Sequence, residues 1–439
     1  MKILQFITII AIALQIVVKN SYCYAANNAI NSSFVQSDEK NTFEFIEAEN
    51  IKSLRLYKLG WELSSPIIEL NSKDKILLSF DDIGENTDTY SYSITHCNSN
   101  WEDSKLYFSD FQSGFEVNEI KDYSYSTSTV FNYMHCRLEI PNEDITLKIS
   151  GNYVIRVFSR YNPDKIILQK RFAVFEPLAD VKTIVRKPSA GDKMISGQKV
   201  EVKVNYGNIP ISNPLGETKL VVCQNYPFQN CQSATRPSII RQTELEYSNP
   251  DVFIFESGNE FRLFDIRNIR FPAQGVKNVD FYAGKFQVLL QPAESKSSLK
   301  YSYYSDMNGR YVMAKENSQQ SHLEADYAWV YFSLISKMPV DKGWNVYLYG
   351  ELTNWQLSTS NIMTYSHESK SYEITKLLKQ GAYSFSYILA NEKTGEVDIS
   401  YFEGSHFDTE NSYTAFFYYK PLGAKYERII GFGGASSIQ

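Results

Sequence analysis

The chain has 439 residues, with 44 Lys and Arg against 50 Asp and Glu, and a formal net charge of −6. This balance argues against a nucleic-acid-binding protein, because no basic surface is available to neutralise phosphates. Hydrophobic residues make up 43% of the chain, which excludes a disordered protein. The 32 Tyr and 27 Phe favour β-strands, and the length predicts about two to four domains.

The N-terminus has the pattern of an export signal. An apolar stretch at 6–18 follows a positively charged start, and small residues lead up to Ala25. This predicts a secretory signal peptide over 1–25, because the apolar stretch is short for a membrane span of about 20 residues. Two alternatives stay open: an uncleaved anchor, or lipidation at Cys23, against which the bulky Tyr22 argues. The mature protein is expected outside the cytoplasm and not inserted in a membrane.

Strand-like segments bounded by turn residues recur from residue 47 onwards. No segment keeps a 3.6-residue hydrophobic period over three turns, so helices are not expected. We therefore predict an all-β fold of three consecutive β-sandwich domains, immunoglobulin-like or early-set-like. In chain order the predicted parts are a flexible lead-in at 26–46, sandwich domains at 47–178, 179–322 and 323–439, and a Gly-rich tail within the last domain.

Four cysteines follow the predicted signal peptide, and an even number in an exported protein permits two disulfides. Cys223 and Cys231 flank a turn-like segment, so a bridge across that hairpin is predicted. Cys97 and Cys136 fall on unlike faces of their strands, because side chains alternate along a strand. A Cys97–Cys136 bridge is therefore the weaker candidate and requires a bulge.

Two His-Cys dipeptides, His96-Cys97 and His135-Cys136, have residue types that bind zinc or act as nucleophiles. Adjacent side chains on a strand point to opposite faces, so these four residues are not expected to converge. The structural interpretation is favoured for both dipeptides, and no metal or catalytic residue is predicted from them.

Other acidic and Gly-rich patterns are equally weak. Asp81 and Asp82 diverge on a strand and are expected to end it. The segment 306–309 resembles half of a calcium loop, but Glu316 lies out of register, and Asn-Gly is explained by a hairpin turn. The glycines of 431–434 have no helix after them and make no phosphate site. We expect no catalytic, cofactor-binding or metal residues.

One segment suggests sugar binding. A strand leads into a Gly-x-x-x-Asn-Trp turn, followed by a Met, a Tyr strand and a Leu-x-x-Gly-x-Tyr strand. The matching residues are Gly350, Asn354, Trp355, Met363, Tyr372, Leu378, Gly381 and Tyr383. Residues 345–389 thereby resemble the early-set sandwich of glycogen- and starch-associated carbohydrate-binding modules. An exposed Trp355 would stack on a sugar ring, whereas a buried one would only support the fold.

A more specific resemblance covers nearly the whole chain. It rests on the order of many short segments: 51–70, 77–83, 94–101, 122–144, 147–158, 303–312, 324–334, 348–355, 377–388 and 401–432. Together these resemble the type IX secretion system plug protein family of the Bacteroidetes. The chain departs from that family's pattern at Cys136, where a Tyr is usual, so a Cys97–Cys136 bridge would be peculiar to this chain.

The resemblance implies a non-enzymatic protein on the periplasmic side of the outer membrane. Such a protein closes the periplasmic mouth of the giant outer-membrane barrel translocon, which is the implied partner, and it takes no nucleic acid and no small-molecule substrate. The sequence does not assign the contact residues. A second hypothesis is a periplasmic carbohydrate-binding protein using Trp355, which requires an exposed indole. A third is a metal- or Cys-dependent enzyme, which requires the two His-Cys dipeptides to converge.

Overall fold

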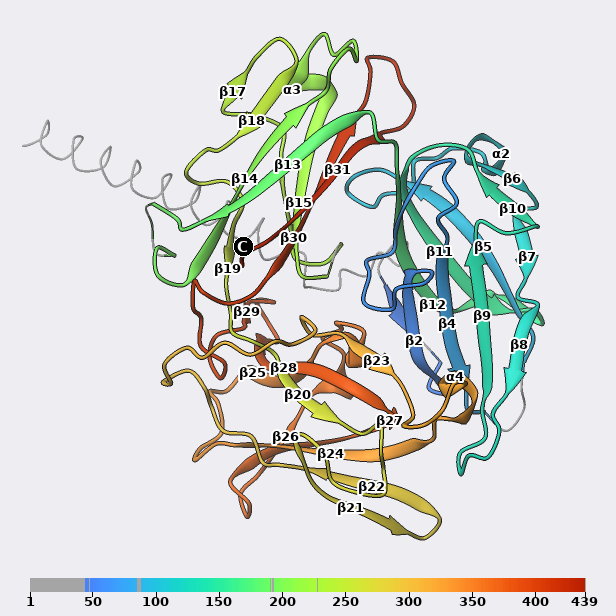
Figure 1. The fold of residues 1–439 in the computed structure, drawn as a ribbon, viewed down its shortest axis with the longest axis vertical. Coiled ribbons are helices and arrows are strands. Elements are labelled where there is room, and N and C mark those ends of the chain that lie inside the picture. The colour runs from blue at the N-terminus through green and yellow to red at the C-terminus, as the bar shows by residue number, and fades with distance from the viewer. Residues whose placement is uncertain are drawn as a thin grey trace, which may run out of the picture.

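The computed structural model describes residues 44–46, 48–84, 88–189, 191, 193–226 and 228–438. The predicted signal peptide and most of the predicted lead-in lie outside the described residues. Within them strands dominate and each helix has only three or four residues, so the predicted all-β class is confirmed. The strands form three groups, each around its own hydrophobic core (Figure 1).

The first domain is a sandwich of two sheets. One sheet has the order β1 (Phe45–Ile46), β12 (Asn162–Phe175), β11 (Gly151–Ser159), β5 (Tyr90–Cys97) and β7 (Val117–Glu119), with β3 (Ile67–Glu69) parallel to β12. The other has the order β2 (Ile51–Lys58), β4 (Ile76–Asp82), β9 (Met134–Ile140) and β8 (Asp122–Tyr125). Beside them, α2 (Phe108–Phe111) leads into a ribbon of β6 (Gln112–Gly114) and β10 (Ile145–Leu147).

Alternation along β11 shows why this sandwich has neighbours on both sides. Tyr153, Ile155 and Val157 belong to the core between the two sheets of the first domain. Val154 points the other way, into a second apolar cluster that also contains Phe416 of the middle domain. One strand therefore serves two packed layers.

The middle domain is one sheet that folds over its own core, rather than two separate sheets. Its order is β16 (Cys231–Ala234), β15 (Thr218–Gln224), β30 (Ser412–Tyr419), β31 (Arg428–Ser436), β13 (Ala179–Arg186), β14 (Gly197–Asn205), β18 (Glu244–Tyr247) and β17 (Ile239–Ile240), with β19 (Ile254–Glu256) also on β14. The short helix α3 (Pro214–Glu217) precedes β15.

Glycines allow the two halves of this sheet to meet at β13 and β31. Ala179 pairs with Gly431 in a short parallel contact between β13 and β31. A Cβ on Gly433 would lie 2.3 Å from the carbonyl oxygen of Val181, which no side chain permits. The predicted Gly-rich tail is therefore wrong as a tail: these glycines form a strand whose backbone lies close to β13.

The third domain is again a two-sheet sandwich. One side has β20 (Arg262–Asp265), β28 (Gly381–Asn391) and β23 (Tyr311–Met313), with β25 (Trp344–Tyr349) and β29 (Val397–Asp398) also paired to β28. The other has the order β21 (Val276–Tyr282), β22 (Lys285–Leu290), β24 (Tyr327–Ile335), β27 (Ser371–Lys379) and β26 (Thr364–Ser366). Short helices are α4 (Ser321–Glu324), η1 (Glu351–Thr353) and η2 (Thr359–Asn361).

The third domain is inserted into the middle one, which corrects the predicted boundaries 179–322 and 323–439. The chain leaves the middle domain after β19, and β30 and β31 return to complete its sheet. Strands β20 to β23, assigned to the second domain by sequence, belong to the third. Hydrophobic alternation identifies strands but not their partners, so consecutive strands were grouped wrongly.

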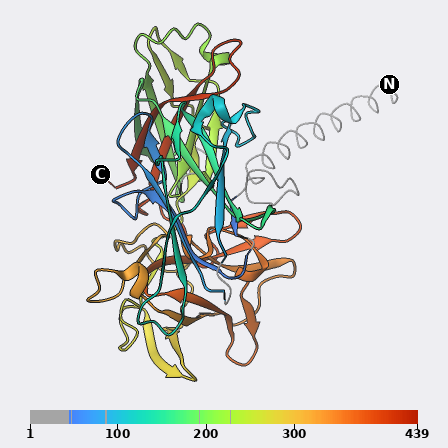
Figure 2. The ribbon, with the colours of Figure 1, turned by 90° about the vertical axis from the view of Figure 1, so that its right-hand side faces the viewer.

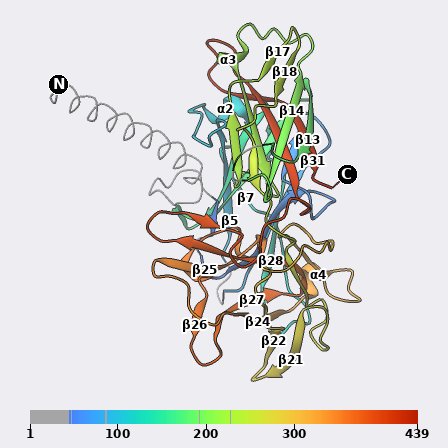
Figure 3. The same cartoon turned by 90° about the vertical axis from the view of Figure 1, so that its left-hand side faces the viewer.

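The three domains meet around a common centre. In Figure 1 the middle domain lies above, the third below, and the first beside both. The side views in Figures 2 and 3 show the middle and third domains stacked end to end. The link from β12 to β13 is held against β31, since the amide of Leu178 donates to the carbonyl of Ile430 at 3.0 Å.

Candidate functional site at the junction of the three domains

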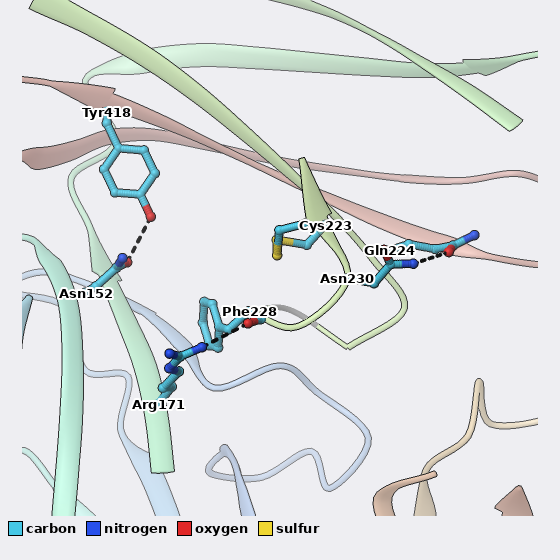
Figure 4. The surroundings of a disulfide bond; sticks show 8 residues. Asn152, Arg171, Cys223, Gln224, Phe228, Asn230 and Tyr418 are labelled. Carbon is cyan, nitrogen blue, oxygen red and sulfur yellow. Dashed lines mark hydrogen bonds between the residues drawn. A yellow bond between two sulfur atoms is a disulfide. The ribbon is translucent and has the colours of Figure 1, made fainter. Parts of the chain in front are cut away.

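A disulfide-closed loop lies at the centre of the molecule. Cys223 at the end of β15 and Cys231 at the start of β16 are directly opposite in the ladder and are bonded, the pair that the spacing predicted. We call the segment that they enclose the disulfide loop. In Figure 4 its Phe228 points toward Arg171 of the first domain, and Asn230 donates to Gln224 across the base of the loop at 2.8 Å.

The disulfide loop contacts both other domains. Toward the first domain, the carbonyl of Phe228 accepts from Arg171 at 3.1 Å, and the Phe228 ring packs edge-on to Trp101 at 4.7 Å. Toward the third domain, the Tyr226 ring stacks on Trp355 with centroids 5.7 Å apart. The disulfide fixes the base of a loop that bridges all three domains.

Trp355 is buried in this junction, with only 6% of its surface exposed. Tyr226 covers one ring face, while Phe261 and Tyr349 pack edge-on at 6.2 and 5.2 Å. A Cβ on Gly309 would lie 2.4 Å from the indole, so the backbone there also packs against it. The ring has no free face for a sugar, which argues against the alternative hypothesis of sugar binding at Trp355; the indole instead joins two domains.

A cavity of about 80 Å³ adjoins Trp355 and the disulfide loop. It is lined by amide side chains, including Asn225, Asn259 and Asn411, as well as by the aromatic rings. This volume is smaller than the roughly 150 Å³ cavity that admits a benzene molecule. A hexose does not fit, which agrees with the burial of Trp355.

Glu44 contacts all three domains. Its carboxylate lies 3.1 Å from the ammonium of Lys170 and accepts from the amide of Arg171 at 3.0 Å, both in the first domain. The Tyr226 hydroxyl of the middle domain donates to it at 3.4 Å, and Gln356 of the third domain donates to its backbone carbonyl at 2.9 Å. Burial lowers the pKa of Lys170, but Glu44 together with Tyr226 and Glu351 outweighs burial, and the net shift is upward.

Residues 44–46, the described part of the predicted flexible lead-in at 26–46, are held against the first domain. Phe45 and Ile46 form β1, paired with Gln169 and Leu168 of β12. Their alternation was too short to recognise as a strand. The contact that fixes them is a buried ion pair with a distant residue, which composition does not reveal.

A second buried charge cluster joins the first and third domains. Asp81 and Lys379 are fully buried, with the carboxylate 2.6 Å from the ammonium. The same carboxylate accepts from the Tyr327 hydroxyl at 2.6 Å and lies 2.6 Å from Nδ1 of His135. Burial raises the pKa of Asp81, but Lys379 and His135 outweigh it and hold the pKa below its usual range. Asp82 diverges, as expected, and accepts from Tyr90 instead.

A third ion cluster surrounds Arg55 of the first domain. Arg55 is fully buried, with its guanidinium 4.9 Å from the ring centroid of Tyr311 in the third domain. Glu62 lies 2.6 Å from it and Glu351 of the third domain 3.9 Å. Arg310 of the third domain donates to the carbonyl of Asn225 in the disulfide loop at 3.1 Å. Sequence reasoning missed this set because isolated charged residues on strands look like solvent-facing positions.

The four His and Cys residues do not converge. Cys136 lies in the core of the first domain, whereas Cys97 lies in the apolar cluster against the middle domain, so the predicted weaker bridge is absent and both thiols are free. Burial raises the pKa of the Cys97 thiol to about 12 and lowers that of His96 to about 4. In the described part of the chain, no three His, Cys, Asp or Glu side chains are grouped to hold a metal ion.

The segment 306–309 makes a turn rather than a calcium site. The carboxylate of Asp306 accepts from the backbone amides of Asn308 and Phe261, and burial raises its pKa to about 7. Glu316 accepts from Asn268 and does not approach Asp306 as a ligand. Asn308 and Gly309 have positive φ values of 49° and 76°, as an Asn-Gly turn requires.

Comparison with known proteins decides the family. Residues 51–176 match the model of the type 9 secretion system plug protein first domain, from the start of β2 to the end of the first sandwich. A crystal structure of a hypothetical protein from Parabacteroides merdae is 31% identical, with a TM-score of 0.87, covering 91% of this chain and 100% of that chain. The chain belongs to the type 9 secretion system plug protein family.

Other comparisons add nothing to this plug-family assignment. The alkylpurine DNA glycosylase AlkC of Pseudomonas fluorescens, bound to DNA containing an abasic site analogue, is 13% identical over 28% of this chain and 30% of that chain, with a TM-score of 0.17. The collagen adhesin of S. aureus is 8% identical over 88% of this chain and 94% of that chain, with a TM-score of 0.10. A search of curated proteins finds no match.

Membership of the plug family indicates a role in type IX secretion and a location in the cell envelope. No helix among the described residues is long and apolar enough to span a membrane.

Proposed function

We propose that this chain is the non-enzymatic periplasmic plug of the type IX secretion system. It associates peripherally with the outer membrane and closes the periplasmic mouth of the giant barrel translocon while no substrate occupies the channel. Family membership supports a structural rather than a catalytic role. It binds no small-molecule substrate and no nucleic acid, and it does not insert into the bilayer.

The observation that carries this proposal is the locked junction. Interfaces between domains of one chain usually permit relative motion. Here Glu44 bonds to residues of all three domains, and Asp81 pairs with Lys379 across a fully buried contact. Moving the domains apart would expose or separate these charges, which is costly. A rigid body of three domains suits the task of obstructing a wide pore.

The carbohydrate-binding alternative is not favoured, because the Trp355 indole is buried between Tyr226 and Phe261. Exposed aromatic side chains occur elsewhere, on the third domain at Phe281 and Tyr282 and on the first at Phe115. Aromatic residues of this kind are typical anchors of protein–protein interfaces.

A permeability experiment tests the proposal. Cells that lack this chain but retain the barrel should take up a hydrophilic antibiotic too large for ordinary porins, and the wild-type gene should restore the barrier. Lys379→Met, which removes the buried ammonium beside Asp81 at the junction, should restore it less well than Lys182→Met at an exposed position. An unchanged barrier in the deletion strain, with the barrel shown to be present, would overturn the proposal.

A further inference from the structure

The hairpin of β21 and β22 forms one edge of the third domain and projects from the end farthest from the middle domain (Figure 1). Among the described strands, β21 pairs only with β22. Its outer residues are exposed, with 58% of Phe281 and 72% of Tyr282 open to solvent. This edge combines a free backbone with large apolar side chains.

The turn fixes which backbone groups are free. Ala283 and Gly284 both have positive φ, at 49° and 73°, so Tyr282 and Lys285 close a two-residue hairpin of the primed type. Hydrogen-bonded and non-bonded pairs alternate along an antiparallel ladder, starting from the bonded closing pair. Phe281 and Val279 therefore belong to non-bonded pairs, and their N–H and C=O groups point away from β22.

Other edges in the described structure are shorter or covered. β8 has four residues, and β7 and β26 have three each. β2 has eight residues, but the third domain packs beside it, where Ser53 hydrogen-bonds to Tyr327 at 2.7 Å. β21 has seven residues, and a bulge disturbs only its start, between Val276 and Asn278. Natural proteins usually blunt such an edge with a bulge or with charged residues. Here the bulge and Lys277 lie at the start of β21, and Asp280 is the one charged residue within the stretch 279–282.

The chemistry of the edge selects its occupant. Two outward N–H and C=O pairs two residues apart match the repeat of an extended backbone, which only another strand satisfies fully. Lys277 of β21 and Lys285 of β22 are exposed beside this stretch, and the one carboxylate between them, Asp280, accepts from the neutral amide of Asn278 at 2.7 Å. Two lysines against one aspartate leave the hairpin with a net positive charge, which favours an acidic strand over a second copy bearing the same lysines.

We propose that β21 takes up an extended segment of the translocon by strand addition. The segment carries apolar residues at alternate positions, beside Val279 and Phe281, and an acidic residue near Lys277. The added strand would cover Phe281 and continue the sheet that already contacts the first domain through Tyr327. This inference rests on the proposed plug function, because that function supplies the partner.

A proline substitution tests the backbone contact without relying on loss of a side chain. Val279→Pro removes an N–H that β22 does not use, and proline is tolerated on an edge strand whose N–H faces solvent. Val279→Thr, the matched control, changes the side chain and keeps the N–H. The tagged full chain is recovered from gently solubilised outer membranes, and the bound barrel is quantified. Thermal unfolding of both variants confirms that each is folded.

We expect Val279→Pro to lower barrel recovery about tenfold or more and Val279→Thr to leave it within about twofold of wild type. Equal recovery with both variants would overturn strand addition while leaving the plug function intact. If the wild type recovers no barrel, the plug function itself fails.

A photo-reactive phenylalanine analogue in place of Tyr282 identifies the occupant. A cross-link to the barrel supports the proposal. A product of twice the chain mass would show that a second copy occupies the edge, and would overturn the assignment to the translocon.

Discussion

The first domain holds its two neighbours by different chemistry. Against the middle domain it uses an apolar cluster that includes Cys97, Trp101, Val154 and Phe416. Against the third domain it uses charge, since Asp81 and Lys379 are buried together there. Apolar contacts contribute in proportion to the area they bury and have no strict geometry. Buried ion pairs contribute little net stability, but either charge alone is costly.

This contrast explains how one molecule is both stable and rigid. The apolar interface supplies free energy of association between the first and middle domains. The ionic interface specifies one arrangement of the first and third domains, because any displacement leaves a charge without its partner. The disulfide loop stands between the two, with Phe228 in the apolar cluster and Asn225 bound by Arg310.

The largest expected effect is on the ionic interface. Lys379→Met leaves the buried Asp81 carboxylate without its ammonium partner and with only His135 and Tyr327 beside it, and should lower the free energy of unfolding by about 3–5 kcal/mol. Lys182→Met, whose side chain is 74% exposed, should change it by less than about 1 kcal/mol. Urea unfolding followed by tryptophan fluorescence measures both changes.

The double variant Asp81→Leu/Lys379→Met sharpens the comparison. Removing both charges should recover most of the loss, because no unpaired ion remains in the interface. Double truncation in the apolar cluster, such as Val154→Ala with Phe416→Ala, should instead lower stability further than either single change. If the stability losses of the two single charge deletions simply add in the double variant, the ionic interface responds like the apolar one and the proposed difference between them fails.

The next effect is a pH dependence at His96, whose ring packs against Tyr153 in the core of the first domain and against Tyr426. Burial lowers the pKa of His96 to about 4, from 6.5 in the unfolded chain. Between these values the unfolded state binds the proton and the folded state does not, so stability falls as the pH falls from about 6.5 to 4. The shift corresponds to about 3 kcal/mol. The free energy of unfolding of the wild type minus that of His96→Gln, measured at a series of pH values, should fall between pH 6.5 and pH 4. Parallel pH profiles for the two proteins would contradict this.

The sequence predicted the strand-rich class and the hairpin disulfide that the structure contains, because both depend on local patterns. Alternation identified most strands, and Cys223 and Cys231 lie across a single turn. Domain boundaries, in contrast, depend on contacts between strands that are distant in the chain. β30 completes a sheet with β15, so boundaries drawn from the order of the strands were wrong.

The junction was also beyond prediction for a physical reason. Lys379 and Tyr327 occupy outward positions on β27 and β24, the pattern of a solvated sheet face. Only the docking of the first domain makes that face an interior one. Trp355 was misleading in the opposite way. It lies in a turn that is typical of sugar-binding modules, where an exposed ring would be expected, but it packs on Tyr226 of another domain.

A smaller effect concerns the disulfide loop. Replacing Cys223 and Cys231 together by Ala frees a short loop in the unfolded chain and should cost about 2 kcal/mol. Because Tyr226 and Phe228 belong to that loop, the destabilisation should extend to its contacts with the third domain at Trp355 and with the first domain at Trp101. Hydrogen exchange should increase at β15 and at η1 beside Trp355. Faster exchange confined to the middle domain would show that the loop does not couple the domains.

The smallest effect is at the rim of the apolar interface. Arg428 of the middle domain pairs with Glu176 at 2.6 Å, but the two side chains are 32% and 21% exposed. Burial raises the pKa of Glu176, while Arg428 and Ser150 outweigh it and lower the pKa. The pair therefore stabilises the fold above the usual carboxyl pKa and is lost as the pH falls through the lowered value. Arg428→Gln should cost only about 0.5–1 kcal/mol at neutral pH, and less in high salt, because solvent screens a pair at this exposure. A cost near that of Lys379→Met would mean that charge, rather than apolar area, also governs the interface with the middle domain.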